Sequence, residues 1–195
     1  MQKIFISDIV FSEQYFPELS KNTGFFVPYI DYIDMIEENL IKGGEILVGW
    51  SAGAHLISKN INTFCNKWKK IILINPYSRL TDNISEQSID TLIKGLGKDF
   101  TKTISYYLSK TGANTKILPD KNIKKQLIET LLYFKKSEVK SESSASNIDI
   151  VYGSANQIIK RSTILNFLKM FKNARFMEVD QPHFVSESLL LSLIH

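Results

Sequence analysis

The sequence predicts a compact α/β fold in which helices cover a mostly parallel sheet. Three observations predict it. Short runs rich in Ile, Val, Phe and Leu alternate with helical patterns towards both ends of the chain. Several of these runs lack polar alternation, as expected for strands that are covered on both faces. The length of 195 residues suits one domain with a sizeable core.

The expected strands are, in order, KIFIS (3–7), GFFVPYI (24–30), EILVGW (45–50), KKIILIN (69–75), IDIVYG (148–153) and ARFMEV (174–179). Helical patterns follow them, with apolar residues three or four positions apart. The expected helices cover residues 29–40, 52–64, 161–171 and 184–194. The alternation of strands and helices favours parallel pairing.

The middle of the chain breaks this alternation. Residues 80–147 contain helical stretches at 89–96, 100–108 and 123–134 but no convincing strand, and they end in the Ser-rich run KSEVKSESSASN. We therefore predict one domain over residues 1–195, with residues 80–147 as a helical cap insertion lying over the sheet edge.

The charge pattern narrows the range of partners. The 24 Lys and Arg against 20 Asp and Glu form no compact basic run, so no nucleic-acid partner is expected. No apolar stretch reaches the roughly 20 residues that span a bilayer, and the chain does not open on a signal-peptide pattern. We expect a cytoplasmic protein without membrane contact. The single cysteine, Cys65, can form no internal disulfide, which suits a reducing compartment.

The segment Gly49-Trp50-Ser51-Ala52-Gly53 follows an apolar strand and precedes a helical pattern. This is the G-x-S-x-G pattern in the strand–turn–helix context that presents a nucleophilic serine. The turn is tight, and side chains at its two flanking positions would collide with neighbouring backbone. We predict Ser51 as the nucleophile and the Ala52 N–H as a donor to the oxyanion.

A serine nucleophile needs a base, usually histidine, and the chain has three. His55 lies one turn into the following helix, where a structural or surface role is expected. His195 is the last residue. His183 follows the last predicted strand, at the sheet end where active groups of such folds gather. We predict His183 as the base.

The third catalytic position follows the strand IDIVYG, where an acid is expected. The loop there reads GSANQIIK, and Asn156 occupies that place. An asparagine carbonyl can accept the Nδ1–H of a histidine and set its tautomer. We favour Asn156. The alternatives are Asp149, Asp180 and, as the better substitute, Asp82.

A second oxyanion donor is expected from the loop after the first strand. The sequence there is FISDIVF, with Ser7, Asp8 and Ile9 at this place, and the Ile9 N–H is the candidate. No phosphate loop, metal-ligand cluster or dinucleotide fingerprint occurs in the sequence, so no cofactor is expected.

At GWSAGA, with VYGSANQII and QPHF following in order, the chain resembles the α/β-hydrolase superfamily. The Gly-Trp-Ser-x-Gly motif is also typical of the pimeloyl-acyl-carrier-protein methyl ester esterases of biotin synthesis, the BioH, BioG and BioV types. The resemblance covers about the first 75 and the last 50 residues, and the middle matches only as a helical cap. It implies a serine carboxylesterase that cleaves a methyl ester through an acyl-enzyme.

The resemblance also implies a substrate path and a partner. The acyl chain would run between cap and sheet, beside Trp50 and Tyr77. An acidic acyl-carrier protein would dock on cap lysines, for which a solvated helix surface is the alternative. These lysines are Lys94, Lys98, Lys102, Lys121, Lys124 and Lys125.

Two other functions stay open. One is a broad short-chain esterase or thioesterase without a carrier partner. The other is a catalytically weak hydrolase scaffold acting as a binding protein, which Asn156 and the missing His-Gly after the first strand favour.

Overall fold

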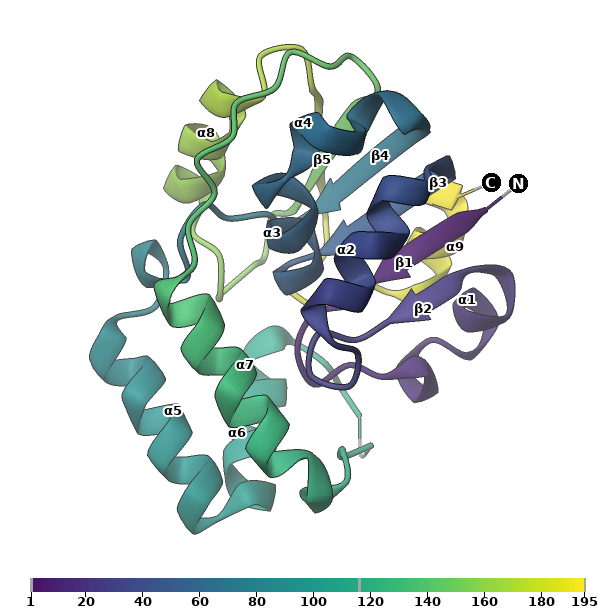
Figure 1. Ribbon diagram of the computed structural model, residues 1–195. Helices are drawn as coiled ribbons and strands as arrows, with labels where there is room; N and C mark the ends of the chain where they lie inside the picture. The colour runs from purple at the N-terminus through teal and green to yellow at the C-terminus, as the bar shows by residue number, and fades with distance from the viewer. Residues whose placement is uncertain (1, 116, 195) are drawn as a thin grey trace.

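The computed structural model describes residues 2–115 and 117–194, and its strands form one parallel sheet (Figure 1). The strands are β1 (Lys3–Ile6), β2 (Gly24–Phe26), β3 (Gly44–Trp50), β4 (Trp68–Ile74), β5 (Ile148–Gly153) and β6 (Arg175–Val179). Their order is β2-β1-β3-β4-β5-β6, and every neighbouring pair is parallel. The predicted α/β class is confirmed.

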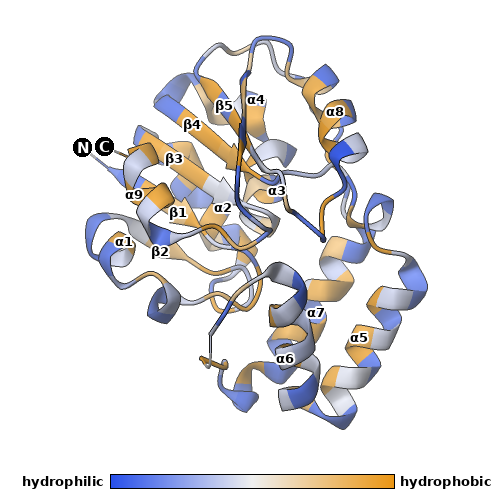
Figure 2. Ribbon diagram, turned by 180° about the vertical axis from the view of Figure 1, so that it is seen from behind, coloured by the Kyte–Doolittle hydropathy of each residue, from blue (hydrophilic) through white to orange (hydrophobic). Residues whose placement is uncertain are grey.

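Helices cover both faces of the sheet. They are α1 (Pro17–Asn22), α2 (Ile33–Lys42), α3 (Ala52–Lys59), α4 (Ile61–Phe64), α5 (Glu86–Lys98), α6 (Phe100–Thr111), α7 (Lys124–Lys136), α8 (Arg161–Met170) and α9 (Glu187–Ile194), with short 3₁₀ turns at Glu13–Tyr15, Cys65–Lys67, Leu80–Asp82 and Lys121–Ile123. Helices α2, α3 and α4 lie in front of the sheet in Figure 1, and α1 and α9 lie behind it. Figure 2 shows the hydrophobic residues concentrated in the strands, most clearly β4. No helix in the described ranges is long and apolar enough to cross a membrane.

The helix expected at residues 29–40 begins later, at Ile33. A turn precedes it, because the backbone N–H groups of Ile30 and Asp31 both donate to the Val27 carbonyl. The Asp31 carboxylate in turn accepts from the Val27 N–H at 2.7 Å. An aspartate that bonds backbone in this way favours a turn over a helix.

Helices α5, α6 and α7 form a separate group beyond the carboxyl ends of the strands (Figures 1 and 2). An ion-pair cluster ties two of them together, since Lys135 Nζ on α7 lies 2.8 Å from Asp90 Oδ1 and 3.4 Å from Glu86 Oε2 on α5. Their buried hydrophobic residues form the inner face of this group. These are Ile89, Leu96, Phe100, Ile104, Tyr107, Leu108, Leu127, Leu131 and Phe134.

His55 connects helix α3 to the end of helix α7. Its side chain is fully buried, Nδ1 lies 3.2 Å from the Tyr77 carbonyl oxygen, and Nε2 lies 2.8 Å from Ser137 Oγ. A carbonyl can only accept, so Nδ1 carries the hydrogen and Nε2 accepts from Ser137. The role of His55 in this structure is therefore structural.

We expect His55 to make stability depend on pH. Burial is the main cause that lowers the pKa of His55 from 6.5 to about 4. Between these values the unfolded chain binds a proton that the folded chain does not, so stability is lost as the pH falls. The loss should reach about 3 kcal/mol by pH 4. Urea unfolding at pH 7 and pH 4 measures it. In the His55→Gln variant, whose new side chain does not titrate, the free energy of unfolding should fall by about 3 kcal/mol less between the two pH values. An equal fall in both proteins would contradict the lowered pKa of His55.

Candidate active site

Ser51 lies at the turn between strand β3 and helix α3. Its backbone has φ 52° and ψ −104°, a region that residues with a side chain seldom adopt. The Ser51 N–H donates to the Ile74 carbonyl at 2.8 Å, which fastens the turn to the end of β4. A strained conformation held by surrounding structure is the pattern that functional sites show.

The two flanking glycines allow this turn. A Cβ added at Gly49 would lie 2.7 Å from the Ala54 nitrogen, and one at Gly53 would collide with the Ile6 carbonyl oxygen. Helix α3 therefore packs directly against the backbone of β1, as the sequence pattern predicted. Ser51 itself is 4% exposed.

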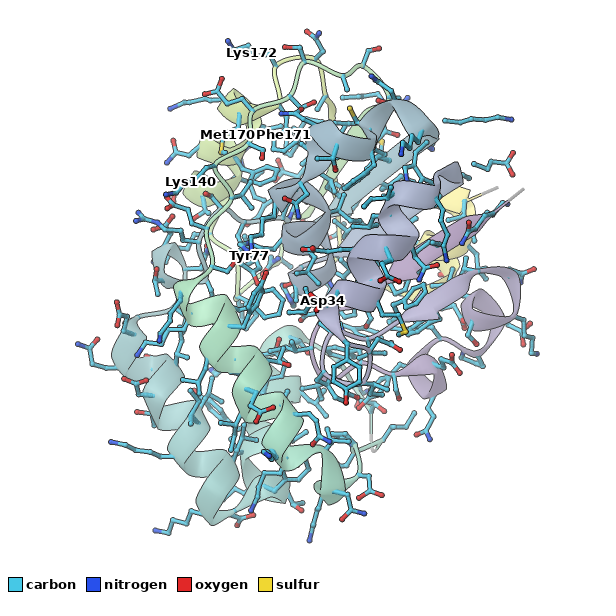
Figure 3. All side chains as sticks on the ribbon, viewed as in Figure 1. Asp34, Tyr77, Lys140, Met170, Phe171 and Lys172 are labelled. Carbon is cyan, nitrogen blue, oxygen red and sulfur yellow. The ribbon has the colours of Figure 1, made fainter. Side chains whose placement is uncertain are left out.

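Ser51 faces a narrow cavity of about 40 Å³ between the sheet and the group of helices α5, α6 and α7, which we call the cap. The lining is almost entirely apolar. It consists of Asp8, Ile9, Val10, Ser51, Ala52, Tyr77, Leu80, Ile84, Ile89, Leu92, Leu96, Thr103, Ile104, Tyr107, Leu127, Leu131, Phe134 and Ile158. Figure 3 labels Tyr77 where the cap meets the core. The predicted contacts Tyr77 and Ile9 thus lie on the cavity. Within the described ranges, the Ile9 N–H has no hydrogen-bond partner.

His183 is buried and its main chain is held firmly. Its carbonyl oxygen accepts from Trp50 Nε1 at 3.0 Å and from Asn75 Nδ2 at 3.1 Å. Its Nε2 lies 3.1 Å from Asp8 Oδ2, and no hydrogen bond joins it to Ser51 among the described residues. Its Nδ1 is buried without a partner there. The structure thus brings His183 to the site with its ring directed at Asp8.

Asp8 is a buried acid at this site for which the sequence predicted no role. It follows strand β1, is 1% exposed, and accepts three hydrogen bonds. The Ala52 N–H donates to Oδ1 at 3.2 Å, and Tyr107 Oη and His183 Nε2 donate to Oδ2 at 2.8 Å and 3.1 Å. Its signal in the sequence was an acid at the place where an oxyanion donor was expected. Asp8 therefore joins the predicted oxyanion donor to the predicted base.

Asn156 does not orient His183 in the expected way. Its Oδ1 accepts from the backbone N–H groups of Ile158 at 2.8 Å and Ile159 at 2.9 Å, which closes a turn after β5. Asparagine favours such local bonds. The expected hydrogen bond from His183 to this oxygen is not formed in the described residues. Asn156 Nδ2 is buried without a partner there, as is His183 Nδ1.

The alternative acids lie elsewhere. Asp82 pairs with Arg79 at 3.1 Å on the surface, and Asp149 pairs with Arg175 at 2.6 Å. Asp180 is exposed. Among the described carboxylates, only Asp8 bonds His183. No group of three His, Cys, Asp or Glu side chains in residues 2–115 and 117–194 could hold a metal ion. His195 lies outside the described residues.

Trp50 does not line the cavity, contrary to expectation. It is fully buried, with its ring centroid 4.7 Å from that of Phe11 and 5.8 Å from those of Phe16 and Phe184. Its Nε1 is engaged with the His183 carbonyl. Trp50 therefore supports the histidine loop from behind and does not contact the cavity.

Asn75 is a second residue without a predicted role. It is fully buried with φ 48°, where asparagine is among the residues best tolerated. Its side chain donates to the His183 carbonyl and accepts from the Gly153 N–H at 2.9 Å. Asn75 thereby joins the loops that follow β4, β5 and β6.

Comparisons with known proteins identify the fold. No protein-family model matches the chain, and no curated protein sequence matches it. Solved structures match nearly all of it. An esterase from Exiguobacterium antarcticum has 12% identity and a TM-score of 0.67 over 99% of this chain and 92% of its own. A hydrolase from Pseudomonas aeruginosa has 10% sequence identity and a TM-score of 0.65, and the match covers 98% of this chain and 87% of the hydrolase. An alpha/beta hydrolase enzyme from a Medee basin deep-sea metagenome has 10% sequence identity and a TM-score of 0.63, and the match covers 100% of this chain and 88% of that enzyme. The chain has the α/β-hydrolase fold.

Proposed function

We propose that the protein is a serine hydrolase of carboxylic esters, with Ser51 as nucleophile and His183 as base. The observation that supports this most is the strained Ser51 between Gly49 and Gly53, facing an apolar cavity at the carboxyl end of the sheet. A serine held at φ 52° costs stability that a glycine would not, which favours a role for its hydroxyl.

The proposed reaction has two steps. Ser51 Oγ attacks the ester carbonyl carbon while His183 takes its proton and passes it to the departing alcohol. Water, deprotonated by His183, then attacks the acyl-enzyme, and the proton returns to Ser51 as the acid leaves. The N–H groups of Ala52 and Ile9 would stabilise the oxyanion in both steps.

The lining of the cavity favours an apolar acyl group. It contains no lysine or arginine, so a charged acyl end would be left without a counter-ion there. The substrate class proposed is therefore a neutral ester with an aliphatic acyl chain.

A finer proposal is that the ester is the methyl ester of pimeloyl-acyl-carrier protein. The motif resemblance supports it, and so does a surface groove of about 610 Å³ next to the cavity. The residues that line both are Ile84, Leu92, Thr103, Tyr107 and Ile158. Lys102 and Lys110 line this groove. A chain leaving the cavity there would reach two cations, which suits an acidic carrier.

A panel of p-nitrophenyl esters from acetate to decanoate tests the general proposal, with Ser51→Ala as the background. We expect kcat/KM to rise about fourfold for each added CH₂ until the cavity is filled, because each buried CH₂ contributes about 0.8 kcal/mol. The absence of Ser51-dependent hydrolysis of every ester would contradict it.

The finer proposal has its own test. Expression of the protein in a biotin auxotroph that lacks the methyl ester esterase should restore growth without biotin. Failure to restore growth, with soluble protein present and the ester panel positive, would leave a broad esterase.

The contacts of Asp8 favour a second candidate function, a hydrolase scaffold with weak catalysis that binds an apolar ligand. The ester panel separates the two, because a binding scaffold would show no Ser51-dependent turnover.

A further inference from the structure

We infer that Asp8 is a built-in blocker of the active site, which the cap holds in place through Tyr107 and which a substrate must displace. This inference rests on the proposed ester hydrolysis and adds a regulatory contact to it.

Asp8 occupies the predicted oxyanion donor. The Ala52 N–H is the donor expected to receive the developing negative charge, and here it donates to Asp8 Oδ1 at 3.2 Å. A carboxylate and a tetrahedral oxyanion both carry negative charge and both need this donor. They cannot occupy one place, and their charges repel at this range. With Asp8 in position, the transition state loses a hydrogen bond and meets an anion.

Asp8 also binds the predicted base. His183 Nε2 lies 3.1 Å from Asp8 Oδ2, and an ionised carboxylate can only accept, so Nε2 carries the hydrogen. A nitrogen that is already protonated cannot take the proton of Ser51. One side chain therefore occupies both the oxyanion donor and the proton acceptor.

A residue of the cap binds Asp8 as well. Tyr107 lies on helix α6, is buried, and donates to Asp8 Oδ2 at 2.8 Å. Burial and the nearby Asp8 raise the pKa of Tyr107 well above its usual range, so its hydroxyl remains a donor. Tyr107 also lines both the cavity and the outer groove. A ligand that enters between them meets the residue that holds Asp8.

The size of the cavity shows that the observed state is closed. A single water needs about 10–15 Å³ of such volume. The cavity of about 40 Å³ thus has room for a few waters and too little for an aliphatic chain. An acyl group therefore needs a wider cavity than this one, and Tyr107, which lines the cavity and bonds Asp8, is among the residues that would have to move.

The loop that carries Asp8 is itself strained. Val10 has φ 80°, an outlier for a β-branched residue, and the Asp8 carbonyl accepts from the Phe11 N–H at 3.4 Å in the same turn. Strain of this kind persists only where other contacts enforce it. The three hydrogen bonds of the Asp8 side chain are among such contacts, together with the Ser7 hydroxyl, which donates to the Phe11 carbonyl.

The rate of Ser51 labelling by a fluorophosphonate tests the inference. The probe needs the nucleophile, the base and the oxyanion donor, and it lacks an acyl chain that could select for cap opening. We expect Asp8→Ala to raise the second-order rate constant about tenfold or more, since one oxyanion donor alone contributes about 10²–10³ in rate. Tyr107→Phe should raise it by a smaller factor. Asp34→Asn, an exposed acid on α2 labelled in Figure 3, is the matched control and should label as the unmodified protein does.

Three outcomes decide the question. Slower or equal labelling of a folded Asp8→Ala protein would overturn the inference and make Asp8 a neutral or required group. If Asp8→Ala does not fold, Asp8→Asn keeps the shape without the charge and should still label faster. If no protein in the series shows labelling that depends on Ser51, the proposed ester hydrolysis is wrong. If all variants are labelled at the same Ser51-dependent rate, only the inference about Asp8 is wrong.

Discussion

Replacement of Ser51 by Ala is expected to lower kcat/KM for ester hydrolysis by a factor of about 10⁴ or more. The hydroxyl is the group that forms the acyl-enzyme, and single losses within such catalytic sets cost this much. Folding should be unaffected, because alanine keeps the Cβ and with it the strained φ of 52°. Hydrolysis of a mid-length p-nitrophenyl ester and a thermal melt of the same sample measure the two effects.

Ser51→Gly is the control that separates strain from chemistry. Glycine adopts a positive φ at little cost, so this variant should be inactive but more stable than the unmodified protein by about 1–2 kcal/mol. His183→Ala should be inactive as well. Activity that survives in Ser51→Ala would place the nucleophile elsewhere and end the serine hydrolase proposal.

Gly53→Ala is expected to destabilise the fold by about 3 kcal/mol or more. The new Cβ would collide with the Ile6 carbonyl oxygen and lie 2.9 Å from the Ile6 Cβ, in the middle of the sheet. Neither the strand nor helix α3 can give way without moving the Ser51 turn, and overpacking in a core costs 1–3 kcal/mol or somewhat more. Urea unfolding gives the free energy, and the ester assay should show a parallel loss of activity.

The matched control is Gly97→Ala, at an exposed position on helix α5. No atom lies within 4 Å of a Cβ added there, so only helix propensity acts. That change should stabilise the protein by roughly 0.5–1 kcal/mol. If both substitutions lowered the free energy of unfolding by a similar amount, the close approach of α3 and β1 at Gly53 would be refuted.

The elements of the fold were predictable because their signals are local. Apolar runs that lack polar alternation mark strands covered on both faces, and β4 and β5 appear within a residue of the predicted bounds. The G-x-S-x-G motif was recognisable because it follows an apolar strand and precedes a helical pattern, and the contacts that exclude a side chain at Gly49 come from Ala54 and Ile57 of that unit. The contact that excludes one at Gly53 comes from Ile6 on β1, which only the tertiary structure shows. The start of α2 was misplaced because the Asp31 turn competes with the helical pattern.

The sequence by itself determined the α/β class, the strained Ser51 and the placement of His183 in the loop after the last strand. Each of these has a short local signal, namely the apolar runs, the G-x-S-x-G motif and the position of His183 soon after the last predicted strand. Only the tertiary structure decided which groups meet His183. Asp8 reaches it from 175 positions away, Asn156 turns its oxygen to its own loop, and Trp50 packs behind the site. Hydrogen bonds between loops depend on the exact directions in which side chains leave parallel strands, and no local pattern of residues encodes those directions.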